Sequence, residues 1–342
     1  SKDKFSFLGK TWSLPIPAFL MPPMMKNHGN YVVSLSNVCK WMGEVAENFG
    51  VEIYPGFSAA EVLFDDSGRV KGVATGDMGV SKDFKAKDSW EPGMELHAKY
   101  TLFAEGARGS LSKFIINHFD LSKDKDHQKF GLGIKELWEI PKEKHNAGLV
   151  EHSFGWPLSD GTTGGSFVYH FDENLVSVGY VVHLSYTNPY VSPFDEFQTF
   201  KTHPSMKKLL TGGKRIAYGA RAIASGGYQS VPKLTFPGGA LIGCSAGFVN
   251  NAKIKGSHNA MATGMLAGKA IFDNFSLDDH STELDRYQDC YDNSRVSKEL
   301  KQVRNFKPIL SRFGIFLGTV LSCIDLWMNA LSIGLPFTLR HG

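Results

Sequence analysis

Residues 243–247 read Gly-Cys-Ser-Ala-Gly, and their residue types could do chemistry directly. They match the G-x-S-x-G pattern in which a hydrolase holds its serine nucleophile on a sharp turn between a strand and a helix. In such a turn the helix begins directly after the serine, whereas here residues 250–256 intervene. The nearest acids and histidine that could complete a triad are Asp278, Asp279 and His280, in a polar linker. The spacing therefore disfavours a hydrolase.

The same loop suits a second chemistry, the binding of a dinucleotide at the carboxyl end of a strand. A glycine-rich loop bares backbone N–H groups, and the N-terminus of the helix expected over residues 256–275 favours negative charge. Small residues lie four apart on one face of that helix and would let it approach a sheet or a flat ring closely: Gly256, Ala260, Gly264 and Gly268. Close packing of the helix on a sheet without a ligand explains the same spacing, so both interpretations stay open.

Two glycine pairs elsewhere give weaker signals. Residues 105–109, Glu-Gly-Ala-Arg-Gly, follow an expected strand and on their own indicate a tight turn. Gly164 and Gly165 precede an apolar, aromatic run over residues 166–170, where they either make a bulge or bare the backbone to a flat ligand. From the residues alone we favour the bulge. No GxGxxG follows an expected strand, so the first phosphate-binding turn of a dinucleotide fold is missing from the chain.

The histidines and cations near these motifs have ordinary explanations. His170 and His183 alternate with apolar neighbours, which is typical of packed or hydrogen-bonded histidines rather than acid–base catalysts. The cations in residues 214–221 indicate a solvated face, although they could also contact an anionic cofactor.

The composition excludes several classes of protein. The 342 residues include 37 Lys and Arg against 34 Asp and Glu, a net charge of +3, which argues against a nucleic-acid binder. The cysteines lack the spacing of a zinc site, a disulfide framework or an iron–sulfur cluster made by this chain alone: Cys39, Cys244, Cys290 and Cys323. The start at Ser1, without a targeting segment, indicates either processing or an internal piece of something longer.

The elements that must position these residues alternate between helices and strands. After an extended, proline-interrupted start, helical spacing over residues 35–46 predicts a helix that is buried on one face and capped by Ser34 or Ser36. Strands are expected at residues 51–54, 61–64, 69–74 and 99–104, the middle two as a hairpin, and a helix is expected at residues 111–118.

A second pattern, rich in aromatic and β-branched residues, runs over residues 129–190 and predicts a mixed sheet. The α/β pattern then returns with a buried strand at residues 239–243, so the first lobe is discontinuous in sequence. The last apolar run, residues 313–324, is too short to span a bilayer and is followed by Asp325. A core helix and a monotopic segment lying in one leaflet both fit this run.

Eight motifs together closely resemble those of the electron-transfer-flavoprotein:ubiquinone oxidoreductase family, over nearly the whole chain. They are residues 28–31, 91–96, 103–106, 155–158, 164–167, 213–222, 232–239 and 243–248. The resemblance implies a flavoprotein of the mitochondrial inner membrane, on its matrix side, or of a bacterial inner membrane. It implies electron transfer from reduced electron-transfer flavoprotein to ubiquinone through FAD and a 4Fe-4S cluster, in fatty acid and amino acid oxidation.

Carried over by position, the resemblance implies two groups of residues that contact FAD. They are Ala104, Glu105 and Gly106, and then Gly243, Cys244, Ser245, Ala246, Gly247, Phe248, Asn250, Gly256 and Ser257. Gly164 and Gly165 would face the quinone head group, which replaces the bulge interpretation. Many related flavoproteins have Asp at the position of Cys244, and its carboxylate accepts a hydrogen bond from the ribityl chain of FAD. Here backbone groups or Ser245 would replace that contact. No side chain is expected to act as a nucleophile.

The implied fold class is α/β (α+β mixed), with a discontinuous FAD-binding lobe like that of glutathione reductase. We expect an extended connector at residues 1–30, the FAD-binding lobe at residues 31–110 and 236–276, an inserted ubiquinone-binding lobe at residues 111–235, and a helical segment with monotopic membrane contact at residues 277–342. The family's N-terminal GxGxxG and C-terminal cysteine-rich cluster domain are absent, which makes this chain a central portion. Two alternatives stay open: an FAD-dependent reductase like geranylgeranyl reductase, and a catalytically incomplete fragment that keeps only protein or membrane contacts.

Overall fold

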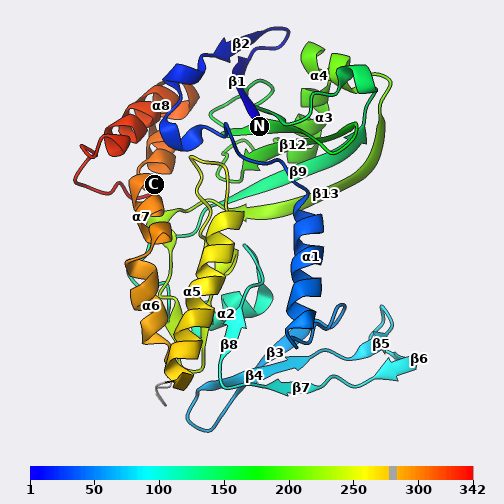
Figure 1. Cartoon of the computed structure of the whole chain (residues 1–342), viewed down its shortest axis with the longest axis vertical. Helices are drawn as coiled ribbons and strands as arrows, with labels where there is room; N and C mark the ends of the chain where they lie inside the picture. The colour runs from blue at the N-terminus through cyan, green and yellow to red at the C-terminus, as the bar shows by residue number, and fades with distance from the viewer. Residues whose placement is uncertain (277–282, 342) are drawn as a thin grey trace.

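A computed structural model describes residues 1–276 and 283–341 of the chain. Its elements gather at two ends of an elongated molecule (Figure 1). One end holds a large sheet with small helices, and the other holds several short sheets. The long helix α5 (Ser257–Ser276) and the shorter helix α6 (Asp285–Asp292) lie between the ends.

The large sheet has seven strands in the order β13-β9-β12-β11-β10-β1-β2. They are β1 (Lys2–Leu8), β2 (Ser13–Ile16), β9 (Phe130–Glu139), β10 (Leu149–Gly155), β11 (Gly164–Phe171), β12 (Leu175–His183) and β13 (Lys214–Ala224). β1 runs parallel to β10, and the other pairs are antiparallel. The sheet expected over residues 129–190 is therefore confirmed, although its strands there pair antiparallel and the parallel pair that makes the sheet mixed comes from β1.

The start of the chain differs from the expected irregular connector. Residues 2–8 form β1, which pairs along the whole of β10. Phe5 is buried and stacks on His152 of β10 with ring centroids 4.9 Å apart. The prolines that follow hide this strand from the sequence pattern, and they lie in β2 and around two short turns, η1 (Ala18–Leu20) and η2 (Pro23–Met25).

Helices α3 (Pro193–Lys201) and α4 (Pro204–Leu210) pack on this sheet. Alternate residues of β12 meet two phenylalanines of α3 in the core between them: Val176, Val178, Tyr180, Val182, Phe197 and Phe200. At the border of this core, Glu136 of β9 accepts hydrogen bonds from Lys201 Nζ at 2.8 Å and from Arg215 Nη1 at 3.1 Å. Burial alone would raise the pKa of Glu136, but these donors hold the pKa below its usual value.

A small sheet at the other end carries the loop that the sequence singles out. β8 (Thr101–Phe103) runs parallel to β15 (Gly239–Leu241), which also pairs with β14 (Thr235–Phe236). The chain leaves this sheet after β8 and returns to it at β14, after the last strand of the large sheet. α2 (Ser110–His118), α5, α6 and α7 (Arg295–Gln302) surround a core that includes Phe103, Phe236, Leu241, Ala267 and Tyr287.

Residues 35–97 form the third group of elements and are poorly buried. It comprises α1 (Leu35–Asn48), β3 (Ala59–Phe64), β4 (Val70–Thr75), β5 (Met78–Val80), β6 (Ala86–Glu91) and β7 (Glu95–His97). The expected hairpin is confirmed as β3 and β4, and the Ser34 hydroxyl caps α1. Two expectations are wrong: residues 51–54 form no strand, and α1 has no buried side chain, with Trp41 62% exposed. The apolar stripe of α1 is present, but no described element buries it.

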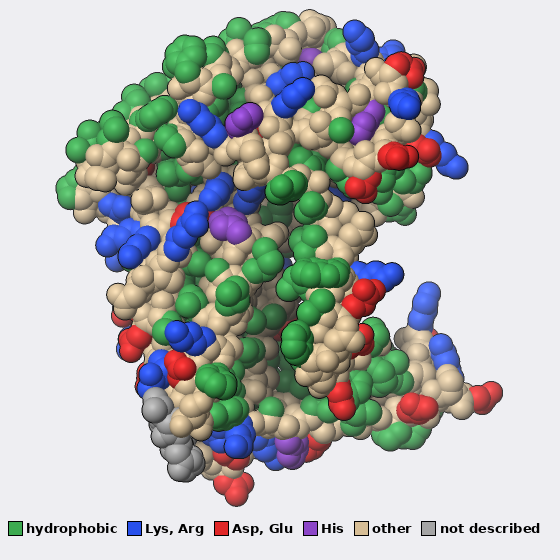
Figure 2. Space-filling model, in the orientation of Figure 1, with side chains coloured by type: hydrophobic (Ala, Val, Ile, Leu, Met, Phe, Trp, Pro, Cys, Tyr) green, Lys and Arg blue, Asp and Glu red, His purple; other side chains and the backbone are tan. Residues whose placement is uncertain are grey.

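The last helix, α8 (Phe306–Ala330), bends at Gly314, where φ is +70°. The segment Arg295–Ala330 is long and apolar enough to cross a membrane by length and composition alone. One stripe of α8 is exposed: Phe313, Phe316, Leu317, Val320 and Ile324. Asp325 lies off this stripe and is buried, and burial raises the pKa of its carboxyl group. Hydrophobic side chains gather over this helix and the adjacent N-terminal segment in Figure 2.

Candidate functional site

The two groups of expected FAD-contacting residues lie side by side. They follow the carboxyl ends of β8 and β15, which are parallel neighbours with Phe103 opposite Leu241. The Ile242 N–H donates to the Phe103 carbonyl oxygen at 3.1 Å and so holds the ends of the two strands together. Because ligands in α/β sheets bind outside the carboxyl ends of strands, this edge is the candidate cofactor site.

Three glycines in these turns adopt backbone conformations that other residues rarely take. The φ angles are +84° at Gly106, +57° at Gly243 and +82° at Gly247. The Gly243 N–H donates to the Thr263 hydroxyl of α5 at 3.1 Å, and a Cβ on Gly247 would collide with the Gln128 side-chain amide. The turns therefore depend on glycine for their shape, whether or not a ligand is bound.

Glu105 has a structural role that the sequence did not indicate. Its carboxylate accepts from the Ser112 N–H at 2.6 Å, the Ser112 hydroxyl at 2.7 Å and the Leu111 N–H at 3.3 Å. The residue at the N-cap of α2 is Gly109, which has no side chain to offer, so Glu105 satisfies the first turn of this helix. Its carboxylate is thus occupied by the protein itself.

The hydrolase interpretation finds no support at Ser245. Its hydroxyl is buried, and it has no hydrogen-bond partner among the described residues, so no general base activates it. The candidate triad partners, Asp278, Asp279 and His280, lie outside the described residues. Burial raises the pKa of the neighbouring Cys244 thiol, which keeps it protonated and a poor nucleophile.

Residues 250–258, which follow the glycine loop and include the first two residues of α5, are held by one carboxylate from α7. Glu299 accepts from His258 Nε2 at 2.8 Å, Asn250 Nδ2 at 2.9 Å and Lys253 Nζ at 3.3 Å. Burial alone would raise the pKa of Glu299, but His258 and Asn250 outweigh it and lower the pKa to about 2. Sequence reasoning missed Glu299, because nothing local links it to a loop more than one helix away.

The small-residue face of α5 is only partly used for close packing. The Ala260 methyl lies 3.4 Å from where a Cβ on Gly243 would be. By contrast, a Cβ on Gly264 or Gly268 would meet no atom of the described residues within 4 Å. Tight helix–sheet packing therefore explains the first half of the stripe, and open space lies beside the second half.

Gly164 and Gly165 begin β11, where the backbone is crowded. A Cβ on Gly164 would collide with the Val181 carbonyl oxygen, and one on Gly165 with the Ser153 carbonyl oxygen. The register with β12 is unbroken from Gly164 to Phe171, so the β11–β12 ladder has no bulge here. The glycines are required by close strand approach, and their backbone stays half-buried.

Both histidines that the sequence treats as packed residues are held neutral. Burial lowers the pKa of His170 to about 4, and the Asn146 N–H donates to its Nδ1 at 3.1 Å. Burial lowers the pKa of His183 to about 3, and the positive charge of Lys307 contributes a smaller part of this shift. Lys307 was also missed by sequence reasoning: it is a cation of α8 that is only 4% exposed.

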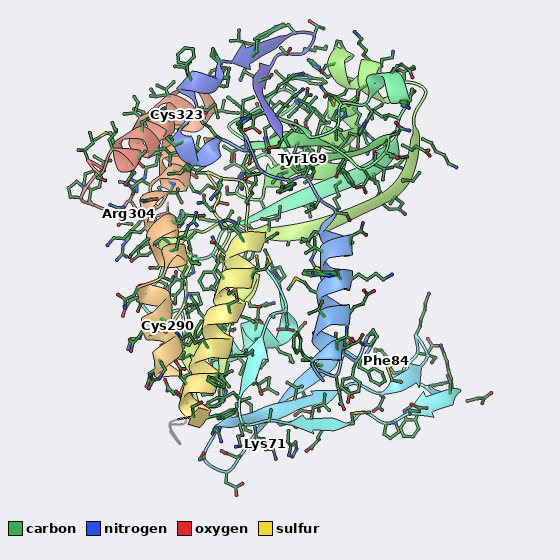
Figure 3. All side chains as sticks on the ribbon, viewed as in Figure 1. Lys71, Phe84, Tyr169, Cys290, Arg304 and Cys323 are labelled. Atoms are coloured by element: carbon green, nitrogen blue, oxygen red, sulfur yellow. The ribbon has the colours of Figure 1, made fainter. Side chains whose placement is uncertain are left out.

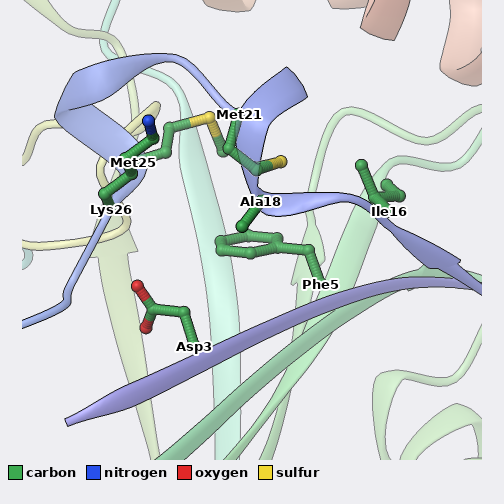
Figure 4. A pocket seen from close by; sticks show the side chains of 7 residues that line it. All are labelled: Asp3, Phe5, Ile16, Ala18, Met21, Met25 and Lys26. Atoms are coloured by element: carbon green, nitrogen blue, oxygen red, sulfur yellow. The ribbon is translucent and has the colours of Figure 1, made fainter.

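The described residues do not form a metal site. No group of three or more His, Cys, Asp or Glu among them could hold a metal ion. Cys290 on α6 and Cys323 on α8 lie far apart in Figure 3. A cavity of about 30 Å³ beneath η1 and η2, lined by Asp3, Phe5 and Met21 among others, has room for a water but not for a flavin or a quinone (Figure 4).

Comparisons with known proteins identify relatives over nearly the whole chain. A family model described as "ETF-QO, ubiquinone-binding" matches residues 130–223. The electron transfer flavoprotein-ubiquinone oxidoreductase of Pseudomonas aeruginosa is 50% identical over 327 residues, which cover 95% of this chain and 59% of that protein. The mitochondrial protein of that name from Homo sapiens is 49% identical, over 100% of this chain and 56% of its own length. The chain thus spans somewhat more than half the length of these relatives.

Solved structures share the fold. A geranylgeranyl bacteriochlorophyll reductase-like protein from Thermoplasma acidophilum matches with a TM-score of 0.62 and 16% identity, over 85% of this chain and 66% of that one. A flavoprotein/dehydrogenase from Cytophaga hutchinsonii matches with a TM-score of 0.58 and 15% identity, over 96% and 78%. These structural matches show a mixed α/β fold shared with flavoproteins. At such low sequence identity they show nothing finer. By its sequence, this chain is a homologue, across nearly its whole length, of electron transfer flavoprotein-ubiquinone oxidoreductases, as its motifs predicted.

Proposed function

We propose that this chain is the flavin- and quinone-binding portion of an electron transfer flavoprotein-ubiquinone oxidoreductase. Such an enzyme takes electrons from reduced electron transfer flavoprotein and passes them through FAD to ubiquinone. The observation that carries the proposal is the meeting of two glycine turns at the carboxyl ends of β8 and β15, in a chain half identical to proteins of that name.

The residues at this edge fit an FAD. The turns at Gly106, Gly243 and Gly247 bare backbone N–H groups, and open space lies beside Gly264 and Gly268 of α5. The Arg221 guanidinium lies 3.6 Å from where a Cβ on Gly106 would be. A cation is therefore close enough to this turn to pair with an anionic group of FAD. FAD, when bound, supplies the electron chemistry, and the residues of this chain hold it, orient it and exclude water.

The domain boundaries follow from this assignment. In the proposal, residues 31–110 and 236–276 form the FAD-binding lobe, and residues 111–235 form the ubiquinone-binding lobe. Residues 1–30 connect to the latter through β1, and the described residues of the C-terminal segment, 283–341, form the helical, membrane-contacting part. Gly164 and Gly165, inside the region matched by the ubiquinone-binding model, would present backbone groups to the quinone head group.

The membrane contact in this proposal is an apolar plateau formed by two segments far apart in sequence. The plateau comprises exposed residues of α8 and of the N-terminal segment: Phe313, Phe316, Leu317, Val320, Ile324, Trp12, Leu14, Phe19 and Leu20. Trp327 Nε1 donates to the Leu20 carbonyl oxygen at 3.1 Å, and the rings of Phe7 and Phe316 lie 5.2 Å apart, so the two segments are joined. We propose that the plateau lies in one leaflet of a mitochondrial inner membrane, on the matrix side, or of a bacterial inner membrane.

The plateau is tested by sedimentation with phosphatidylcholine vesicles that contain cardiolipin. The variant Phe316→Asp/Val320→Asp should bind at least about tenfold more weakly, because two anchoring side chains are lost. Phe84→Asp is the matched control, since Phe84 is 92% exposed at the opposite end of the molecule (Figure 3). Equal vesicle binding by all three proteins would remove the plateau from the proposal.

The described residues do not fit a 4Fe-4S cluster, because they bring no set of ligands together. In the proposal its ligands belong to the part of the relatives' length that this chain does not span.

Flavin content tests the cofactor site. Gly247→Ala should lose most of the flavin absorbance of the protein purified in the presence of FAD, because φ at Gly247 is +82° and the new methyl would collide with Gln128. Gly68→Ala is the control: φ there is +79°, nothing lies within 4 Å, and the residue sits in the distant β3–β4 turn. Equal flavin content in the two variants would contradict the proposed site.

The two alternatives are separable from this proposal. The geranylgeranyl reductase-like neighbour shares only the fold, whereas identity near 50% over the whole chain favours the quinone oxidoreductase. A folded wild-type chain that binds no FAD would support the incomplete-fragment alternative instead.

A further inference from the structure

Lys307 is a buried cation with no carboxylate partner among the described residues. It is 4% exposed, and its ammonium group donates to a single acceptor, the Thr163 hydroxyl at 3.3 Å. Burial, with the nearby charge of Lys129 in second place, lowers its pKa to about 8. A charged group this deeply buried is usually paired or occupied by a ligand, so its single hydroxyl contact calls for an explanation.

The position of Lys307 supplies that explanation. Thr163 directly precedes Gly164 and Gly165, and its carbonyl oxygen accepts from the His183 N–H at 3.0 Å. His183 Nδ1 is buried and also has no hydrogen-bond partner among the described residues. Two polar groups with unused hydrogen-bonding capacity therefore meet at the start of β11. Thr163 and Gly164 are only half-buried there, so this end of the strand can be approached.

We propose that Lys307 is a quinone-binding residue whose ammonium group donates a hydrogen bond to a carbonyl oxygen of the head group, beside Thr163 and Gly164. This inference rests on the proposed function and adds a cationic side chain to its quinone site. A quinone becomes a quinol by taking up two electrons and two protons, and its oxygens gain negative charge as the electrons arrive. A fixed, desolvated ammonium stabilises that charge more strongly than a neutral donor would.

The test is calorimetric titration of the wild-type chain and two variants with decylubiquinone. Lys307→Met keeps the length of the side chain and removes the donor, and it should weaken binding about ten- to a hundredfold, the range for one hydrogen bond to a charged group. Lys307→Arg should keep most of the affinity. Lys301→Met, on the exposed surface of α7, is the matched control and should bind as the wild type does.

A second ligand separates binding of the oxygen from packing. An analogue of decylubiquinone with hydrogen in place of both carbonyl oxygens should bind wild type and Lys307→Met equally. A Lys307→Met chain that binds decylubiquinone as tightly as the wild type overturns this inference alone. A wild-type chain that binds no decylubiquinone overturns the quinone part of the proposed function together with it.

The pH dependence of wild-type affinity gives a readout that needs no variant. Affinity should fall as pH rises through about 8, because the ammonium loses its proton there. The groups that face Lys307 are Lys129, His183 and His341. The backbone N–H of His341 donates to the Asp126 carboxylate. Burial lowers the pKa of both histidines below its usual value, so neither titrates in this range. Affinity that stays constant across pH 8, with unchanged binding by Lys307→Met, would exclude the role.

Discussion

Glu299 and Lys307 lie on neighbouring helices, and both are removed from solvent, yet the protein treats their charges in opposite ways. Glu299 accepts from three donors: Asn250 and Lys253 of the loop that leads into α5, and His258 in the first turn of α5. Lys307 has one hydroxyl and no carboxylate among the described residues. The Glu299 carboxylate is fully paired within the chain, whereas the Lys307 ammonium group is not.

This difference separates structural from ligand-binding roles by physical chemistry. Taking an ion out of water costs several kcal/mol, and only partners recover that cost. Glu299 recovers it within the chain, so it acts as a positioning residue for the loop beside the candidate FAD site. Lys307 recovers little, which is expected of a group whose partner arrives with a substrate.

The largest effect is expected for Glu299→Gln. The substitution should lower the free energy of unfolding by about 2 kcal/mol at neutral pH, because it leaves the donors of the loop without a carboxylate. The folded pKa is about 2 against an ordinary 4.5, so the stabilisation is complete above the ordinary value and is lost as pH falls toward 2. Urea unfolding of both proteins between pH 7 and pH 2 measures the difference, which should shrink over that range.

Glu151→Gln is the control for Glu299. Glu151 pairs with Lys4 at 3.0 Å on the surface, where the Lys4 side chain is 62% exposed, so its loss should change stability by less than about 0.5 kcal/mol. If the two variants were destabilised equally, the hydrogen bonds of Glu299 to residues 250–258 would contribute no more to stability than a surface ion pair. Flavin content should fall with Glu299→Gln and stay constant with Glu151→Gln.

A change of the opposite sign is expected for Lys307→Met. Because the buried ammonium is costly, the variant should be as stable as the wild type or more stable by up to about 2 kcal/mol at pH 7. The folded pKa is about 8 against an ordinary 10.5, so between these values the unfolded chain binds more protons and wild-type stability rises with pH. The advantage of the variant should therefore narrow above pH 8 in thermal unfolding. A variant that is clearly less stable would place Lys307 with Glu299, as a structural residue.

Much of the fold could be predicted because it follows from local periodicity. The β3–β4 hairpin and α5 appear in the sequence as an alternating run with an Asp/Ser/Gly turn and as a long helical repeat. The turns at Gly106 and Gly243 could be placed because they follow apolar strands. Their meeting at one sheet edge needed the parallel pairing of β8 with β15, which no local signal specifies.

The parts that could not be predicted depend on contacts between distant residues. The stripe of α1 indicates a helix with one apolar face, yet periodicity does not say what covers that face, and Trp41 is exposed. Glu299 and Lys307 occupy ordinary helical positions, so their different environments appear only when the loop and β11 are brought to them. The crowding around Gly164 and Gly165 by neighbouring strands is a third case, because its cause lies on β10 and β12.

The smallest effect is expected for Glu105→Gln, and it tests the comparison on a residue that the family resemblance assigns to the cofactor. The Glu105 carboxylate is already occupied by the first turn of α2, so by the reasoning applied to Glu299 it is structural. A glutamine keeps one acceptor oxygen and loses the negative charge at a helix N-terminus, which should cost about 0.5 to 1 kcal/mol of stability.

Flavin content of Glu105→Gln, measured by absorbance beside its unfolding free energy, decides between the two roles. We expect unchanged flavin in a slightly less stable protein, since the bound group would contact the backbone of this turn rather than the carboxylate. Loss of flavin at wild-type stability would show that the carboxylate serves the ligand despite its three internal donors. Internal satisfaction of a charge would then no longer distinguish Glu299 from Lys307, and only the binding measurements on Lys307 could do so.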